Sequence, residues 1–150
     1  MNDRRGFTLI EMIIVIALGA ILTSIAIASF SNVQQGAAMD QSRRVLWSMH
    51  ARARAQAIEN GQNVELRISG PGDSVAVVRN DTILESLHVE EEFGIDLAIT
   101  GDEVRLCFGP NGIADLGCNS FTSLISGSLR STAGDTFFFF LFPAGGIIES

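Results

Sequence analysis

The longest apolar run in the chain lies close to its beginning. Residues 7–30 consist mainly of Leu, Ile, Val and Ala, and no proline interrupts them. As a helix, these twenty-four residues would extend for about 36 Å, enough to cross the hydrocarbon core of a bilayer. A secretory signal peptide has a shorter apolar region, of about 7–15 residues. The pattern therefore predicts a transmembrane helix over residues 7–30.

A helical period continues after this run, but with only one narrow apolar face. Between residues 46 and 57, apolar side chains recur at steps of three and four, which is the spacing of an amphipathic helix. Asn60 and Gly61 follow, and glycine readily takes the left-handed conformation that ends a helix. We expect residues 31–61 to continue the first helix and to pack on a sheet. The apolar face comprises Leu46, Met49, Ala53 and Ala57.

Beyond Gly61 the apolar positions alternate with polar ones, as they do in strands. In residues 63–69, Val64, Leu66 and Ile68 alternate with charged side chains, which predicts a half-buried strand. Similar short segments follow, and most are bounded by Gly, Asp or Asn. Short strands in succession indicate an antiparallel sheet, so we expect an α+β fold whose β-rich globular domain occupies residues 62–150. Further strands are expected at 74–80, 82–90, 94–100, 103–109 and 136–142.

The last of these segments is apolar at almost every position. Residues 136–142 read TFFFFLF, which predicts a strand with both faces buried. Left exposed, such a run would favour aggregation. A patch that binds a partner is the alternative interpretation of the same residues.

Charge distinguishes the beginning of the chain from the rest. The formal net charge is −7, and all ten basic residues are arginines. This acidic balance argues against general nucleic-acid binding, which needs clustered basic side chains on phosphates. Arg4 and Arg5 precede the apolar run, and positive charge there favours retention of that end in the cytoplasm. We therefore expect a single-pass protein whose C-terminal domain lies outside the cytoplasm.

One carboxylate, Glu11, lies inside the apolar run. A charge within a membrane helix costs up to about 2.5–3.5 kcal/mol at the centre and less near an end, so a partner is expected. Cleavage after Gly6 would make Phe7 the new N-terminus. Its positive amine could then pair with the Glu11 carboxylate of the same chain or of a neighbour.

The segment RRGFTLIEMIIVIALGAIL resembles the class III signal of type IV pilins and type II secretion pseudopilins. That pattern is a short basic leader ending in Gly, here residues 1–6, followed by Phe-Thr-Leu-Ile-Glu and a long apolar helix. The resemblance implies that a prepilin peptidase cuts after Gly6 and methylates Phe7. It also implies that Glu11 attracts the amine of an adjacent subunit during filament assembly, which would explain why the carboxylate is tolerated.

The same resemblance implies a location and a set of partners. The protein is expected in the inner membrane, with its C-terminal domain, residues 62–150, in the periplasm, and the tip of a filament is one position open to it. Its partners would be the prepilin peptidase, an inner-membrane assembly platform and other major and minor pilins or pseudopilins. Whether the filament is a type IV pilus or a type II secretion pseudopilus stays open at this point.

Two further segments resemble the narrower GspH/FimT-type group of minor pilins and pseudopilins. They are residues 44–68, where an Ala- and Arg-rich helix end meets an NGQ turn, and residues 104–115, with a Phe108-x-Pro110-x-Gly112 turn. Some FimT-type pilins bind DNA through basic residues near the C-terminus, but no basic side chain follows Arg130 here. The alternative functions are a pilus-borne domain that binds DNA for uptake or captures another extracellular ligand, and a membrane-anchored domain that never polymerises.

Cys107 and Cys118 lie eleven positions apart. In an oxidising compartment they can form a disulfide, which would stabilise the fold by roughly 2–3 kcal/mol. Two free buried thiols are the alternative. Neither cysteine has the neighbours of a metal site, and we expect none.

Enzyme signatures are lacking in the sequence. It contains no glycine-rich phosphate loop, CxxC, HExxH or GxSxG, so we expect neither catalysis nor a cofactor. His50 and His88 are expected to be surface or packed residues, Trp47 a packing residue and residues 90–92 a solvated acidic loop. The carboxylates of Asp96, Asp102 and Glu103 could meet at a turn and bind calcium, although their spacing lacks the EF-hand pattern.

Overall fold

The computed structural model describes residues 8–150, apart from the side chains of residues 26–32. The chain divides into two compact units, Met1–Gln34 and Gln35–Ser150. The predicted leader, residues 1–6, and the predicted new N-terminus, Phe7, lie outside the described residues.

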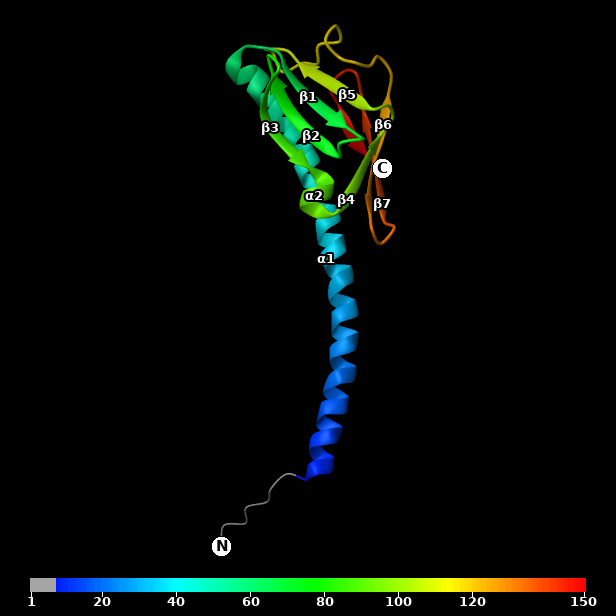
Figure 1. The fold of residues 1–150 in the computed structure, drawn as a ribbon. Coiled ribbons are helices and arrows are strands. Elements are labelled where there is room, and N and C mark those ends of the chain that lie inside the picture. The colour runs from blue at the N-terminus through cyan, green and yellow to red at the C-terminus, as the bar shows by residue number, and fades with distance from the viewer. Residues whose placement is uncertain (1–7) are drawn as a thin grey trace. The chain divides into compact units, whose positions relative to one another are not determined.

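Helix α1 spans Leu9–Asn60, so the two helical segments expected from the sequence form one continuous element (Figure 1). Gly61 follows with φ +63°, the left-handed conformation that was expected at the helix end. In residues 9–25 the large apolar side chains are all exposed. No helix formed by the described residues is long and apolar enough to cross a membrane. The transmembrane helix expected over residues 7–30 therefore stays a prediction.

The second unit contains two four-stranded antiparallel sheets where one sheet was expected. Their strand orders are β3-β2-β1-β5 and β4-β6-β7-β8. The chain changes sheet after β3, because the short helix α2 and Gly94, with φ +66°, redirect it. As a result β4 pairs with β6 rather than with β3. The elements are β1 (Val64–Ser69), β2 (Ser74–Arg79), β3 (Thr82–His88), α2 (Val89–Phe93), β4 (Ile95–Ile99), β5 (Glu103–Phe108), β6 (Ile125–Ser131), β7 (Thr136–Leu141) and β8 (Ile147–Glu149).

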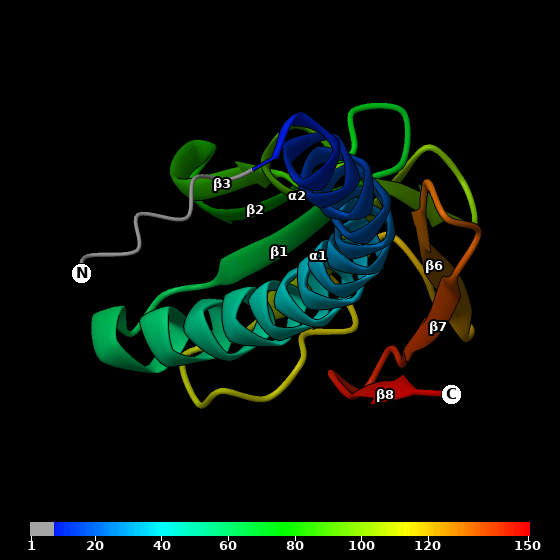
Figure 2. The same ribbon diagram turned by 90° about the horizontal axis from the view of Figure 1, so that it is seen from below.

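The core lies between the later part of α1 and the inner faces of the sheets. The four side chains of the predicted apolar stripe are each no more than 3% exposed, so that prediction is confirmed. Figure 2 shows this part of α1 running alongside β1. The strands contribute alternate apolar side chains to the same cluster, and the structure therefore has the predicted α+β architecture.

The phenylalanine run does not have both faces buried, so this expectation was wrong. Phe139 and Leu141 are fully buried, whereas Phe138 is 51% exposed. The reason is that the sheet containing β7 packs on the core through one face only. On the inner face the Phe139 ring lies against Gly127 of β6, with which it is in register.

Residues 90–92 also differ from the expectation of a loop. Their exposed glutamates belong to α2, where acidic side chains in the first turn are favourable at the positive end of the helix dipole. Strands β6 and β8 were not predicted. The inward positions of β6 include Gly127 and Ser131, so that strand carries no clear alternation of apolar and polar residues.

Candidate functional site

The described chain begins with a reciprocal pair of hydrogen bonds at the start of α1. The backbone N–H of Glu11 donates to Thr8 Oγ1 at 3.3 Å, and the backbone N–H of Thr8 donates to Glu11 Oε2 at 3.5 Å. Thr8 directly precedes the first helical residue, so the pair forms a capping box. Thr8 and Glu11 fit the Ser/Thr-x-x-Glu sequence pattern of such boxes. This pattern is present in the sequence, but the capping box was not predicted from it.

This arrangement gives Glu11 a role within its own chain. Its carboxylate satisfies a backbone N–H that the helix leaves unpaired, and its negative charge lies at the positive end of the helix dipole. Glu11 is exposed, and its second oxygen has no hydrogen-bond partner among the described residues. The carboxylate can therefore cap the helix and still accept a contact from outside the chain. Gly6 and Phe7, the predicted cleavage and methylation residues, lie outside the described residues.

Cys107 and Cys118 are joined by a disulfide, with their Cα atoms 5.8 Å apart. Cys107 is buried in β5, and its backbone N–H donates to Asn119 Oδ1 at 2.8 Å. The disulfide and this hydrogen bond hold the loop after β5 against the strand. Glu65 lies close enough to both sulfurs to suggest a metal site, but sulfurs joined in a disulfide cannot act as thiolate ligands.

The turn expected after Phe108 packs on the end of α1. The backbone N–H of Gly112 donates to Gly109 O at 2.8 Å, and Gly112 has φ +71°. A Cβ at Gly112 would lie 2.6 Å from Ile58 Cδ1, so the turn approaches the helix closely. Its glycine is required both by the backbone conformation and by this contact.

His50 of α1 contacts two other elements. Its Nε2–H donates to the carbonyl oxygen of Gly145 at 2.9 Å, in the turn between β7 and β8. Its ring meets the Phe108 ring edge-on at a centroid distance of 5.2 Å. Burial lowers the pKa of His50, and the charge of Arg54 acts in the same direction, while the hydrogen bond to Gly145 opposes them. His50 is thus a packed histidine, as the sequence suggested.

Two arginines of α1 form ion pairs that connect the helix to the sheets. Arg43 pairs with Glu149 of β8 at 2.7 Å, and its guanidinium lies over the Phe137 ring at 4.2 Å. Arg52 pairs with Glu85 of β3. Both side chains therefore serve as contacts between α1 and the two sheets.

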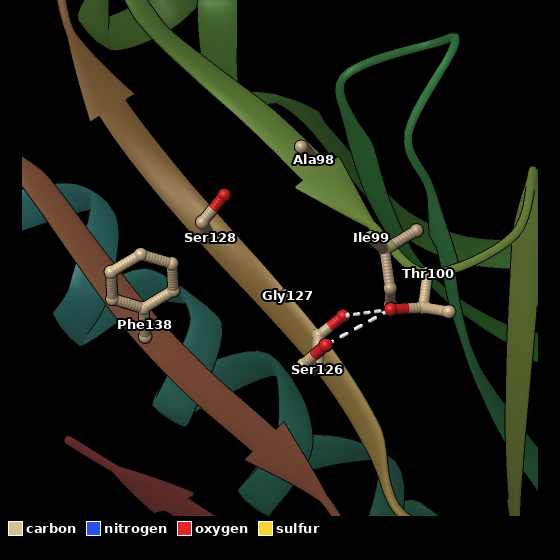
Figure 3. Close-up of a pocket in the computed structure, with 7 residues that line it drawn as sticks. All are labelled: Ala98, Ile99, Thr100, Ser126, Gly127, Ser128 and Phe138. Atoms are coloured by element: carbon tan, nitrogen blue, oxygen red, sulfur yellow. Dashed lines mark hydrogen bonds between the residues drawn. The ribbon is translucent and has the colours of Figure 1, made fainter.

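In the part of the chain that the structure describes, no surface hollow is lined by a set of side chains that could act together in catalysis. One hollow of about 470 Å³ lies between α1 and β3, around the Arg52–Glu85 pair. Another, of about 250 Å³, lies on the face of β4, β6 and β7 beside Phe138 (Figure 3). Asp96, Asp102 and Glu103 do not converge into a cluster that could hold a cation. His88 is exposed on β3 and Trp47 is half-buried on α1.

The fold and the N-terminal segment together define the class of protein that the chain resembles. Residues 1–27 match the family model of the prokaryotic N-terminal methylation motif. No curated protein sequence matches the chain. The two-sheet domain with its long helix is a pilin-like α+β fold, as the comparison with solved structures shows.

Two of those structures are crystal forms of the type IV minor pilin FimU from Pseudomonas aeruginosa strain PAO1. Both superpose with a TM-score of 0.52 over 74% of this chain, covering 87% and 91% of the FimU chains. Sequence identity is 12% and 11%, so the likeness establishes the fold alone.

Proposed function

We propose that the chain is a minor pilin or pseudopilin of the GspH/FimT type, a structural subunit of a type IV pilus or a type II secretion pseudopilus. One observation carries the proposal. A methylation motif over residues 1–27 leads into a helix whose later part packs on a pilin-like domain. A subunit that is processed at one end and presents a folded domain at the other needs no catalytic site of its own.

In this proposal a prepilin peptidase cuts between Gly6 and Phe7 and methylates the Phe7 amine. Residues 7–30 anchor the chain in the inner membrane and later enter the filament core, while the second unit lies in the periplasm. The partners are an assembly platform in the inner membrane and other pilins or pseudopilins. The similarity to FimU concerns the fold, and it supports a pilin-like subunit in either kind of filament.

Mass spectrometry of the intact chain from its native membrane fraction tests the processing step. We expect a chain that begins at methylated Phe7. A chain that still begins at Met1 in cells with an active prepilin peptidase would contradict the proposal, and so would cleavage near residue 30.

The assembly role of Glu11 needs a test that separates it from the capping role. Glu11→Gln keeps an oxygen that can accept the Thr8 N–H but removes the charge that would attract a neighbour's amine. Thr8→Ala removes the hydroxyl half of the capping box and keeps the carboxylate. We expect Glu11→Gln to abolish incorporation into filaments while membrane association persists, and Thr8→Ala to cause a smaller loss.

Equal losses from the two variants would mean that Glu11 acts mainly as a helix cap. Normal filament incorporation of Glu11→Gln would mean that assembly does not depend on the charge of Glu11. Absence of the unmodified chain from filaments would favour an anchored domain that does not polymerise.

A further inference from the structure

Exposed apolar side chains gather on the outer face of sheet β4-β6-β7-β8. Phe138 and Phe140 alternate with the buried Phe139, and Ile148 of β8 is in register with Phe140. Phe138 and Ile148 are each 51% exposed. Single exposed apolar residues are ordinary on protein surfaces, but a group of them on adjoining strands indicates an interaction site.

The hollow of about 250 Å³ lies on this same face, immediately beside Phe138. The outward neighbours of Phe138 across the strands are Ser128 of β6 and then Ala98 of β4, and both side chains are small. Figure 3 shows the Phe138 ring beside Ser128 of the neighbouring strand, with Ala98 on the strand beyond. A cavity of about 150 Å³ is enough to hold benzene, so the hollow has room for a phenyl ring.

We propose that this face is a contact surface between two copies of the chain, in which Phe138 of each copy enters the hollow of the other. A two-fold contact uses the same patch on both subunits, so the patch must be complementary to itself. A projecting aromatic ring beside a hollow of suitable size meets that requirement. Aromatic residues that fill a pocket in the partner are also the usual main contributors to interface energy.

The charges bordering the hollow favour a second copy over a strongly charged partner. Asp96 of β4 and Arg130 of β6 are in register with each other, two positions from Ala98 and Ser128 on the same face. Both are exposed, and neither has an ion-pair partner among the described residues. Each copy thus offers one charge of each sign, and Arg130 of one copy can pair with Asp96 of the other. Such pairing offsets the repulsion between two chains that each carry a net charge of −7.

Cross-linking of the full-length chain in its membrane fraction tests the contact. Ser128→Cys places a thiol in the proposed interface, while the native cysteines are already joined to each other. Mild oxidation should give a disulfide-linked dimer of the chain. Adding Phe138→Ser should reduce the dimer yield about tenfold or more, the usual effect of losing a central aromatic contact.

The matched control is Ile113→Ser, which removes a side chain that is 61% exposed but lies in the loop after β5. It should leave the dimer yield unchanged. Labelling of the introduced thiol with a small maleimide should proceed equally in all variants, which excludes loss of thiol access. Adding Glu11→Gln should not affect the cross-link, because the contact does not depend on the proposed filament function.

A charge exchange makes the test stricter. In the Ser128→Cys chain, Asp96→Arg alone should lower the dimer yield, and Asp96→Arg combined with Arg130→Asp should restore it. The proposal is overturned by absence of a dimer, by a dimer that Phe138→Ser does not reduce, or by a cross-link to a different protein in place of the second copy.

Discussion

Asp73 Oδ1 accepts a hydrogen bond from the backbone N–H of Leu97 at 2.7 Å. Asp73 lies in the turn between β1 and β2, and Leu97 lies in β4, so the bond joins the two sheets. The backbone oxygen of Asp73 also accepts from the N–H of Val89 at 2.7 Å, at the start of α2. Asp73 has φ +43°, a conformation that Asp and Asn adopt more readily than other residues with side chains.

Asp73→Ala should lower the free energy of unfolding of the second unit by about 1–3 kcal/mol, because the partly buried N–H of Leu97 loses its partner. Urea denaturation followed by the fluorescence of Trp47 would measure this. Asp73→Asn is the matched control, since its amide oxygen can accept the same bond and tolerates the same φ. Equal destabilisation by the two substitutions would show that the hydrogen bond is not the important feature.

Gly127→Ala should destabilise the fold although it adds only one methyl group. The new Cβ would lie 2.2 Å from the Phe139 ring, so the ring would have to move within a packed core, at a cost of about 1–3 kcal/mol. Thermal unfolding would measure the loss. In the double variant with Phe139→Leu, the two losses should sum to more than the observed total, because the smaller side chain makes room. Additive losses would contradict the proposed clash.

Reduction of the disulfide, or the double variant Cys107→Ser/Cys118→Ser, should lower the free energy of unfolding by roughly 2–3 kcal/mol. Peptide mapping of chain purified without reductant should recover the segments around residues 107 and 118 as one linked species. Alkylation of both thiols without prior reduction would contradict the bond.

Acid should weaken the fold through His50. Because its pKa in the folded chain lies below the ordinary value of 6.5, the unfolded chain binds the proton more tightly. The stabilising contribution is therefore fully present above about pH 6.5 and is lost as the pH falls from there through the folded pKa. His50→Gln should remove this component, so the difference between wild-type and variant unfolding free energies should change with pH in that range. A constant difference from pH 7.5 to pH 5 would contradict the prediction.

The sequence correctly predicted those elements whose burial follows directly from the spacing of their apolar residues. The stripe from Leu46 to Ala57 repeats with the helical period, and it is buried as expected. The division into two sheets could not be read in the same way, because it depends on which strand β4 pairs with. That choice is made by Gly94, by α2 and by the Asp73–Leu97 bond, which are separated in the chain from the partner strand β6.

Single residues were harder to place than elements. Nothing in TFFFFLF marks Phe138 as outward and Phe139 as inward, since both are phenylalanine and the distinction depends on the neighbouring strands. Strand β6 was not predicted because Gly127 occupies one of its inward positions. The glycine leaves space for the Phe139 ring and adds no apolar side chain to the alternating pattern. At the candidate site, Glu11 was recognised as unusual from the sequence, but its bonds with Thr8 were not anticipated.

The side chains that connect α1 to the sheets also affect how the second unit would respond to force. Arg43 contacts β8, His50 contacts the turn before β8, and Arg52 contacts β3. A pull on the helix would act on these three links together with the buried stripe between them. Separating the helix from the domain under tension would therefore require breaking its contacts with both sheets.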